Sequence, residues 1–219
     1  ANIKEIAKRG KNPLAGPLKL GVIYTIAPYL LPDLVRNVIQ TSPEMPLMLH
    51  ENFTVKLLEM LRTGEIDCAI LAEPFPDVGL ATAPLYDEPF MAAVPSNHSL
   101  SAEKAVSANA LKNETMLLLG NGHCFRDHVL EVCPEFARYS SNAAGIQKSF
   151  EGSSLETIKH MVAAGMGVTL VPRSSVPKDA LDNQAKRKKS DETYVRFLPI
   201  IGDGGGEPPK RRVVLAWRR

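Results

Sequence analysis

Residues 18–40 read LKLGVIYTIAPYLLPDLVRNVIQ, in which a short apolar run leads into a segment with helical spacing. The run at 18–23 predicts a buried strand, and the leucines and valines within 28–40 recur at the 3.6-residue period of an amphipathic helix. Two prolines then break the chain before a second strand at 47–51. This stretch therefore indicates a strand, a helix and a second strand that pack as layers.

The same alternation continues to residue 71. A helix is expected at 54–63, where Gly64 ends it, and a third strand is expected at 66–71, which is mostly apolar on both faces. Because strands joined by helical crossovers pair in parallel, this order predicts a parallel sheet covered by helices. The expected fold class is α/β.

The rest of the chain predicts a second α/β lobe. A strand at 90–95 follows a change of pattern near Tyr86. Ser153 and Glu156 have the spacing of a capping box, which predicts the start of a helix that runs to about Ala164. Further helices are expected at 105–112 and 125–132, and further strands at 115–119, 168–171, 194–199 and 212–216.

These elements predict a division into two lobes. We expect residues 17–87 and 193–219 to form the first lobe and residues 88–192 to form the second, which carries two of the three cysteines. Residues 1–16 are polar and basic, and we interpret them as the end of a linker from a domain that this sequence lacks.

The composition is that of an ordinary soluble protein, and the chain is expected to be cytoplasmic. Hydrophobic residues make up 44% of the chain, and its net charge of +2 does not indicate a nucleic-acid partner. We interpret the basic clusters, among them Lys210-Arg211-Arg212, as solvated surface. The N-terminus has no secretory signal, and no apolar run is long enough to span a membrane. Three cysteines are too few for the disulfide framework of a small secreted protein. We expect no cofactor.

Residues 122–134, GHCFRDHVLEVCP, carry most of the reactive chemistry. Cys124 lies between His123 and, two residues on, Arg126, and both are cationic neighbours of the kind that stabilise a thiolate. A helix at 125–132 would also place Cys124 at its positive end. Cys124 is therefore the expected thiolate.

Cys133 follows nine residues later. A helix would separate the two Cα atoms by about 13–14 Å, whereas a disulfide needs them within about 7 Å. A metal site formed by Cys124, His128, His123 and Cys133 would require a segment that is not helical. From spacing, a redox pair is favoured over a metal site, and a pair of structural thiols stays open as a third interpretation.

Hydroxyl groups follow several predicted strands. Thr25 and Thr54 come after the first and second strands, where parallel sheets bind ligands, and Ser153 and Ser154 begin a helix. Each is individually explained by capping or turn formation, but together they favour a small polar ligand. Cys68 lies in an apolar strand and is interpreted as a buried structural residue.

The chain resembles the effector domain of LysR-type transcriptional regulators over residues 17–219. The residues that carry this resemblance are 21–32, 67–71, 154–157 and 161–172. Within that family, Gly122-His123-Cys124-Phe125-Arg126-Asp127 with Cys133 closely resembles the sensor segment of the peroxide-responsive members. The departures from the family lie in residues 134–150, 183–192 and 202–209.

This resemblance implies two Rossmann-like lobes arranged as in type II periplasmic binding proteins. It implies that Cys124 is the peroxidatic cysteine, that Cys133 resolves it in a reversible disulfide, and that the motif around them, with His123, Arg126 and Asp127, tunes the reaction. Thr25, Thr54 and Ser154 are expected to bind the ligand, and no metal is expected.

The resemblance also implies partners. Hydrogen peroxide would be the signal, and a cellular dithiol of the glutaredoxin or thioredoxin type would reset the disulfide. The regulator would be a homodimer or homotetramer that binds promoter DNA only through an N-terminal domain, and it would not be an enzyme. Two alternative functions remain: an effector domain for a small anionic metabolite, and a cysteine-based thiol peroxidase.

Overall fold

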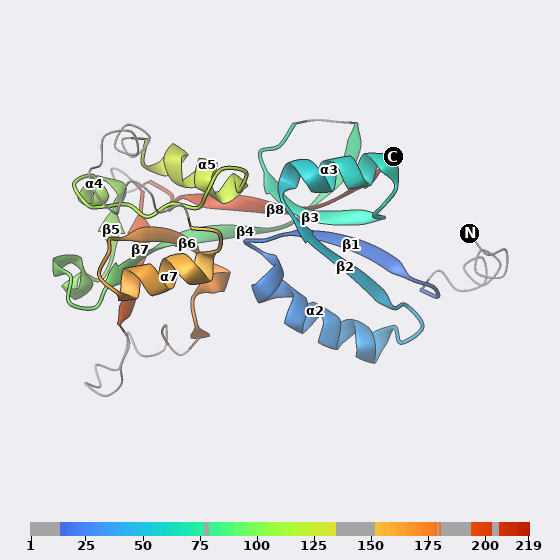
Figure 1. Cartoon of the computed structure of the whole chain (residues 1–219), viewed down its shortest axis with the longest axis horizontal. Coiled ribbons are helices and arrows are strands. Elements are labelled where there is room, and N and C mark those ends of the chain that lie inside the picture. The colour runs from blue at the N-terminus through green and yellow to red at the C-terminus, as the bar shows by residue number, and fades with distance from the viewer. Residues whose placement is uncertain (1–13, 77–78, 135–151, 179, 181–193, 203–205) are drawn as a thin grey trace. The chain divides into compact units, whose positions relative to one another are not determined.

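The computed structural model describes residues 14–76, 79–134, 152–178, 180, 194–202 and 206–219, and it divides into two compact units (Figure 1). Unit 1 comprises residues up to Tyr86 together with Val213–Arg219, and unit 2 comprises Asp87–Arg212. The chain therefore passes between the units within two strands, β4 (Leu80–Pro95) and β8 (Lys210–Arg218). The linker expected at 1–16 lies outside the described residues except for residues 14–16.

Unit 1 contains the parallel sheet that the first 71 residues predict. Its central strand β1 pairs in parallel with β2 on one side and β3 on the other. Helices α2 and α3 connect these strands in the expected order. The elements are β1 (Leu18–Ile23), α2 (Ala27–Thr41), β2 (Leu47–Asn52), α3 (Thr54–Thr63) and β3 (Cys68–Glu73).

Gly21 explains how closely α3 packs on this sheet. A Cβ atom at Gly21 would lie 2.7 Å from Leu57 Cδ2 on α3 and 2.7 Å from Ile66 Cδ1. Leu57 and Ile66 are both fully buried. The centre of β1 therefore has no room for a side chain on this face, and the glycine allows the helix to approach the strand.

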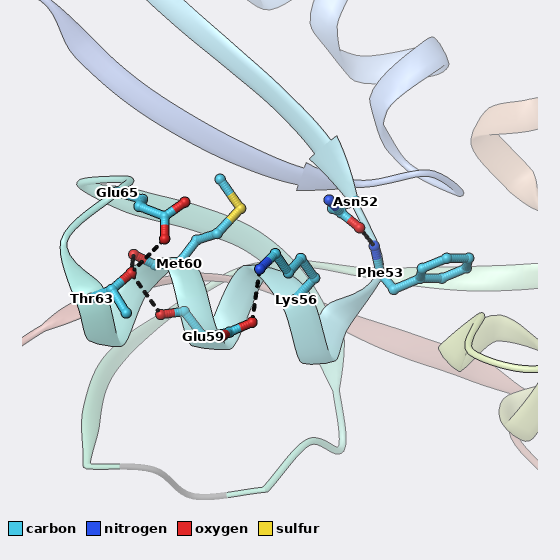
Figure 2. A network of polar contacts seen from close by, with 7 residues as sticks. All are labelled: Asn52, Phe53, Lys56, Glu59, Met60, Thr63 and Glu65. Carbon is cyan, nitrogen blue, oxygen red and sulfur yellow. Dashed lines mark hydrogen bonds and ion pairs between the residues drawn. The ribbon is translucent and has the colours of Figure 1, made fainter.

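Polar contacts lie near each end of α3 (Figure 2). Before the helix, the Phe53 N–H donates to Asn52 Oδ1 over 2.9 Å. At the other end, Thr63 Oγ1 donates to the backbone carbonyl of Glu59 over 3.1 Å. Gly64 then adopts φ 76°, the left-handed conformation that ends helices, as its position in the sequence predicts.

Unit 2 is a mixed sheet with helices. Residues Phe90–Ala93 of β4 pair antiparallel with β6, and Met91–Pro95 pair antiparallel with β7, which in turn pairs in parallel with β5. The strands are β5 (Val106–Ser107), β6 (Thr169–Pro172) and β7 (Val195–Ile201). The helices are α4 (Ala108–Leu111), α5 (Cys124–Val132) and α7 (Leu155–Ala163), with short 3-10 turns at Ser99–Ala102 and Arg173–Ser175.

Three predicted elements of unit 2 are corrected. Residues 115–119 do not form a strand, because their backbone groups are divided between two partners: Leu117 N–H donates to Val168 and Gly120 N–H donates to Gly152. The helix expected at 105–112 is limited to α4. The strand expected at 194–199 pairs within unit 2 rather than returning to the first lobe.

The cap of α7 is also shifted by one residue from the prediction. Ser154, not Ser153, is the N-cap, and its Oγ accepts a hydrogen bond from the Thr157 N–H over 3.2 Å. Ser153 and Glu156 therefore do not form the expected capping box. The end of the helix is as predicted, since Gly165 follows it with φ 82°.

Among the described helices, none is both long and apolar enough to cross a membrane.

We predict that replacing Gly21 by Ala lowers the free energy of unfolding by about 1–3 kcal/mol, because the new methyl group overpacks the contact between β1 and α3. Ile66→Val removes the Cδ1 atom that the methyl group would meet. Ile66→Val should therefore cost less in the Gly21→Ala background than in the native chain, as measured by urea unfolding. Strictly additive losses would contradict this packing argument.

Candidate redox site

Cys124 is the first residue of α5, and the preceding residue, His123, is its N-cap with φ −81° and ψ 114°. The helix expected at 125–132 is confirmed and begins one residue earlier. The first backbone N–H groups of a helix carry partial positive charge, which favours an anion at this position. Cys124 is half-buried, so this field acts on the sulfur with incomplete screening by solvent.

Cys133 lies at the other end of the same helix. It is the C-cap of α5, its side chain is fully buried, and its N–H donates to the Val129 carbonyl over 2.9 Å. None of the chain's three cysteines forms a disulfide. A helical rise of 1.5 Å per residue places the Cα atoms of Cys124 and Cys133 about 13–14 Å apart, roughly twice the distance that a disulfide allows.

The surroundings of His123 disfavour its charged form. Its side chain is 7% exposed, and burial lowers the pKa of the imidazole, an effect that a hydrogen bond to the backbone of Ser153 only partly opposes. This effect opposes the expected role of His123 as a cationic neighbour of Cys124. A neutral imidazole would still be a hydrogen-bonding group next to the sulfur.

Arg126 fixes the loop that precedes α5. Its Nη1 donates to the Leu119 carbonyl over 2.9 Å. Residues two apart on a helix do not share a face, so helix spacing alone does not bring this guanidinium to Cys124. Asp127, three residues after Cys124, is exposed in the first turn of α5. A carboxylate at this position interacts favourably with the helix dipole.

The segment before α5 lies against the segment before α7. Gly120 N–H donates to the Gly152 carbonyl over 3.0 Å, and His123 reaches the backbone of Ser153. Ser154, predicted as a ligand-binding residue, instead holds its hydroxyl within 3.0 Å of Thr157 Oγ1 while it caps α7. The structure thus brings two helix N-termini together near Cys124 and shows Ser154 engaged in capping.

The inner face of α5 covers a buried ion pair that the sequence reasoning missed. Phe125 is 1% exposed, and the Arg211 guanidinium carbon lies 5.2 Å from the centre of its ring. Arg211 is itself 1% exposed and pairs with Glu88. The interpretation of residues 210–212 as solvated surface is therefore wrong for Arg211. The alternation of side chains along a strand could have indicated this burial, because Arg211 lies on the same face of β8 as the buried Val213.

Thr25 and Thr54 occupy matching positions in unit 1. Ile23 pairs with Asn52, and the rings of the next residues, Tyr24 and Phe53, make an edge contact with centroids 5.2 Å apart. Thr25 and Thr54 each lie two residues beyond this pair, just past the carboxyl ends of neighbouring parallel strands, and both are buried.

Within the described part of the chain, the buried hydroxyl of Thr54 has no hydrogen-bond partner. Buried hydroxyls are nearly always hydrogen-bonded, so an unsatisfied one indicates a position for a small polar ligand or water. This finding supports a ligand-binding interpretation of Thr54.

Cys68 begins β3 and differs chemically from Cys124. Burial, with a smaller contribution from the adjacent Asp67 carboxylate, raises the pKa of the Cys68 thiol. No group of three or more His, Cys, Asp or Glu residues in the described ranges is arranged to hold a metal ion.

Comparison with known proteins identifies similar chains. Residues 11–219 match the family model described as the LysR substrate binding domain. A hydrogen peroxide-inducible genes activator of Pectobacterium carotovorum is 37% identical over 216 residues, which are 99% of this chain and 65% of that protein. The chain therefore spans slightly less than two thirds of the length of this curated relative.

Two solved structures show the same likeness in three dimensions. The reduced form of the OxyR regulatory domain from Pseudomonas aeruginosa has a TM-score of 0.75 and 41% identity, covering 94% of this chain and 90% of that one. A cysteine-to-serine mutant of Corynebacterium glutamicum OxyR with bound H₂O₂ has a TM-score of 0.78 and 31% identity, covering 99% of this chain and 62% of that one.

We predict that iodoacetamide modifies Cys124 before Cys68 at pH 7. The raised pKa of Cys68 leaves a smaller thiolate fraction at neutral pH, and the thiolate is the reactive form. Alkylation of Cys68 should quicken by nearly tenfold per pH unit until its pKa is reached. Peptide mass spectrometry of a timed reaction at pH 7 and pH 8 measures both rates, and earlier labelling of Cys68 would contradict the assignment.

Proposed function

Because this chain belongs to the LysR substrate binding domain family, we propose that it is the peroxide-sensing regulatory domain of a LysR-type transcriptional regulator. One observation carries the proposal: a half-buried cysteine and a fully buried cysteine lie at opposite ends of one helix, too far apart for a disulfide while that helix persists. Oxidation of this pair must therefore change the fold locally.

The proposed reaction has two steps. The Cys124 thiolate attacks one oxygen of hydrogen peroxide, the O–O bond breaks, and the leaving hydroxide takes up a proton to become water. Cys124 becomes a sulfenic acid. The Cys133 thiol then attacks that sulfur, an S–S bond forms, and a second water leaves. In sum, two thiols and one peroxide give one disulfide and two waters.

The second step demands refolding of α5. Cys133 has to leave its buried position at the C-cap, and the backbone hydrogen bonds between the two cysteines have to break before the Cα atoms approach within about 7 Å. The chemistry of one peroxide molecule thereby becomes a conformational change of unit 2. We propose that this change alters the DNA binding of the whole regulator and transcription of oxidative-stress genes.

The neighbouring residues have proposed roles that follow from their surroundings. The N-terminus of α5 stabilises the Cys124 thiolate, and His123 contributes as a neutral hydrogen-bonding group. Arg126 holds the preceding loop in place through Leu119, and Asp127 supports the start of the helix. The motif thus acts by positioning and field rather than by a ring of cations.

The names of two similar proteins support a reaction with hydrogen peroxide. The curated relative is called a hydrogen peroxide-inducible genes activator, and a solved relative contains bound H₂O₂. We propose that the whole regulator works in the cytoplasm as a homodimer or homotetramer and binds promoter DNA through a separate domain. A dithiol of the glutaredoxin or thioredoxin type would reduce the disulfide. The chain consumes peroxide stoichiometrically, which distinguishes it from a thiol peroxidase.

One observation favours binding of a small polar ligand in addition. The buried, unsatisfied Thr54 hydroxyl and the buried Thr25 both lie just past the carboxyl ends of neighbouring strands of the unit 1 sheet, the position that a small anionic effector or peroxide itself would occupy. We propose Thr25 and Thr54 as ligand-binding residues on this ground. Ser154 is a weaker candidate because its hydroxyl already caps α7.

We predict that one equivalent of peroxide removes two hydrogens from the chain, and that the loss maps to a peptide pair joined through Cys124 and Cys133. Mass spectrometry of intact and digested protein measures this directly. Cys68→Ser is the matched control and should leave the reaction unchanged. An unaltered mass, or a bridge that includes Cys68, would refute the proposal, and consumption of many equivalents of peroxide per chain would indicate a peroxidase instead.

A further inference from the structure

Glu88 and Arg211 form a buried ion pair in unit 2 that the proposed reaction does not use. Arg211 Nε donates to Glu88 Oε2 over 2.8 Å, and Arg211 Nη2 lies 2.8 Å from the same oxygen. The other carboxylate oxygen, Oε1, accepts from the Ser174 N–H over 2.9 Å. The Glu88 carboxylate thus holds the guanidinium in a defined place within a protein interior.

The guanidinium meets the sensor helix through one side chain. Its carbon lies 5.2 Å from the centre of the Phe125 ring, within the range of a cation–π contact. Phe125 also makes an edge contact with Phe90, with ring centroids 5.2 Å apart. Because Phe125 directly follows Cys124, the contact holds the reactive end of α5.

Disulfide formation and this contact compete. Phe125 lies inside the loop that a Cys124–Cys133 bond would close, and that loop cannot keep the helical backbone that presents the ring to Arg211. The contact therefore contributes to the reduced state and not to the oxidised one. Any interaction confined to one state shifts the equilibrium between the two.

We propose that Arg211, held by Glu88, is a positioning residue that stabilises reduced α5 through the face of Phe125 and so sets how readily the disulfide forms. This inference rests on the proposed function. It assigns Arg211 a role through Phe125 and requires no contact between Arg211 and either sulfur. Glu88 and Arg211 also lie one residue inside the two points where the chain passes between the units.

A purely structural pair would behave differently. If Arg211 and Phe125 only stabilised unit 2 as a whole, their loss would weaken the reduced and oxidised forms alike and leave the equilibrium between them unchanged. The equilibrium constant for disulfide formation against a reference dithiol is therefore the informative quantity, and a tenfold change in it corresponds to about 30 mV in midpoint potential.

The experiment is a double-mutant cycle on that equilibrium constant, with Phe125→Leu, Arg211→Lys and the double variant. Phe125→Leu removes the ring face, and Arg211→Lys keeps the charge but removes the planar group that lies over the ring. We expect Phe125→Leu to raise the constant for oxidation roughly three- to thirtyfold. In the Arg211→Lys background, Phe125→Leu should raise the equilibrium constant for oxidation less. The increase should be smaller than in the native chain by a factor of about three or more.

The matched control is Arg212→Lys. Arg212 neighbours Arg211 on β8 and pairs with Asp87, with Nε 2.8 Å from Oδ1, but on the exposed side of the strand. This variant should leave the equilibrium constant within about twofold of the native value. Circular dichroism of the reduced proteins checks their folding. If Arg211→Lys does not fold, Glu88→Gln takes its place in the cycle, because it loosens the guanidinium without removing it.

The outcomes separate the two proposals. If the native chain forms the Cys124–Cys133 disulfide and Phe125→Leu shifts the equilibrium equally in both backgrounds, the positioning role of Arg211 is overturned while the redox function stands. If the native chain forms no such disulfide, the proposed function fails and this inference fails with it. A smaller shift in the Arg211→Lys background supports the inference.

Discussion

The incompatibility of a disulfide with a nine-residue helical separation governs the behaviour of unit 2. While α5 is intact, the Cα atoms of Cys124 and Cys133 stay about 13–14 Å apart, so the two sulfurs cannot form a disulfide. The separation of the two sulfurs therefore lasts only as long as this one short helix. Helices of this length are marginal in isolation, so tertiary contacts such as the burial of Phe125 and Cys133 stabilise it.

Burial determines how the charged and polar groups act around that helix. The same low-dielectric interior that lowers the pKa of His123 also strengthens the pair of Glu88 and Arg211. The backbone N–H groups at the start of α5 contribute to the field at Cys124 whether or not the imidazole is charged. A site of this kind is less sensitive to a single lost cation than one that depends on a ring of charged side chains.

Periodicity predicted unit 1 well, since 18–23, 28–40 and 54–63 each correspond closely to an observed element. The helix that carries the cysteines was also predictable, because its apolar spacing and its ends are local features. The failures have one cause: they depend on partners distant in sequence. Residues 115–119 form an apolar run typical of a strand but share their hydrogen bonds between two segments, and the effect of burial on His123 depends on which residues cover it.

Hydrogen exchange of the α5 backbone amides tests the central claim most directly. Exchange rates of the amides of residues 127–132, the first of which can bond to the His123 carbonyl, are compared in the reduced protein and in protein whose Cys124–Cys133 disulfide has been verified by mass. The account predicts slow exchange in the reduced form, where the helix is hydrogen-bonded, and a loss of that protection over most of the helix in the oxidised form. Equal protection in both forms, with the disulfide present, would contradict it.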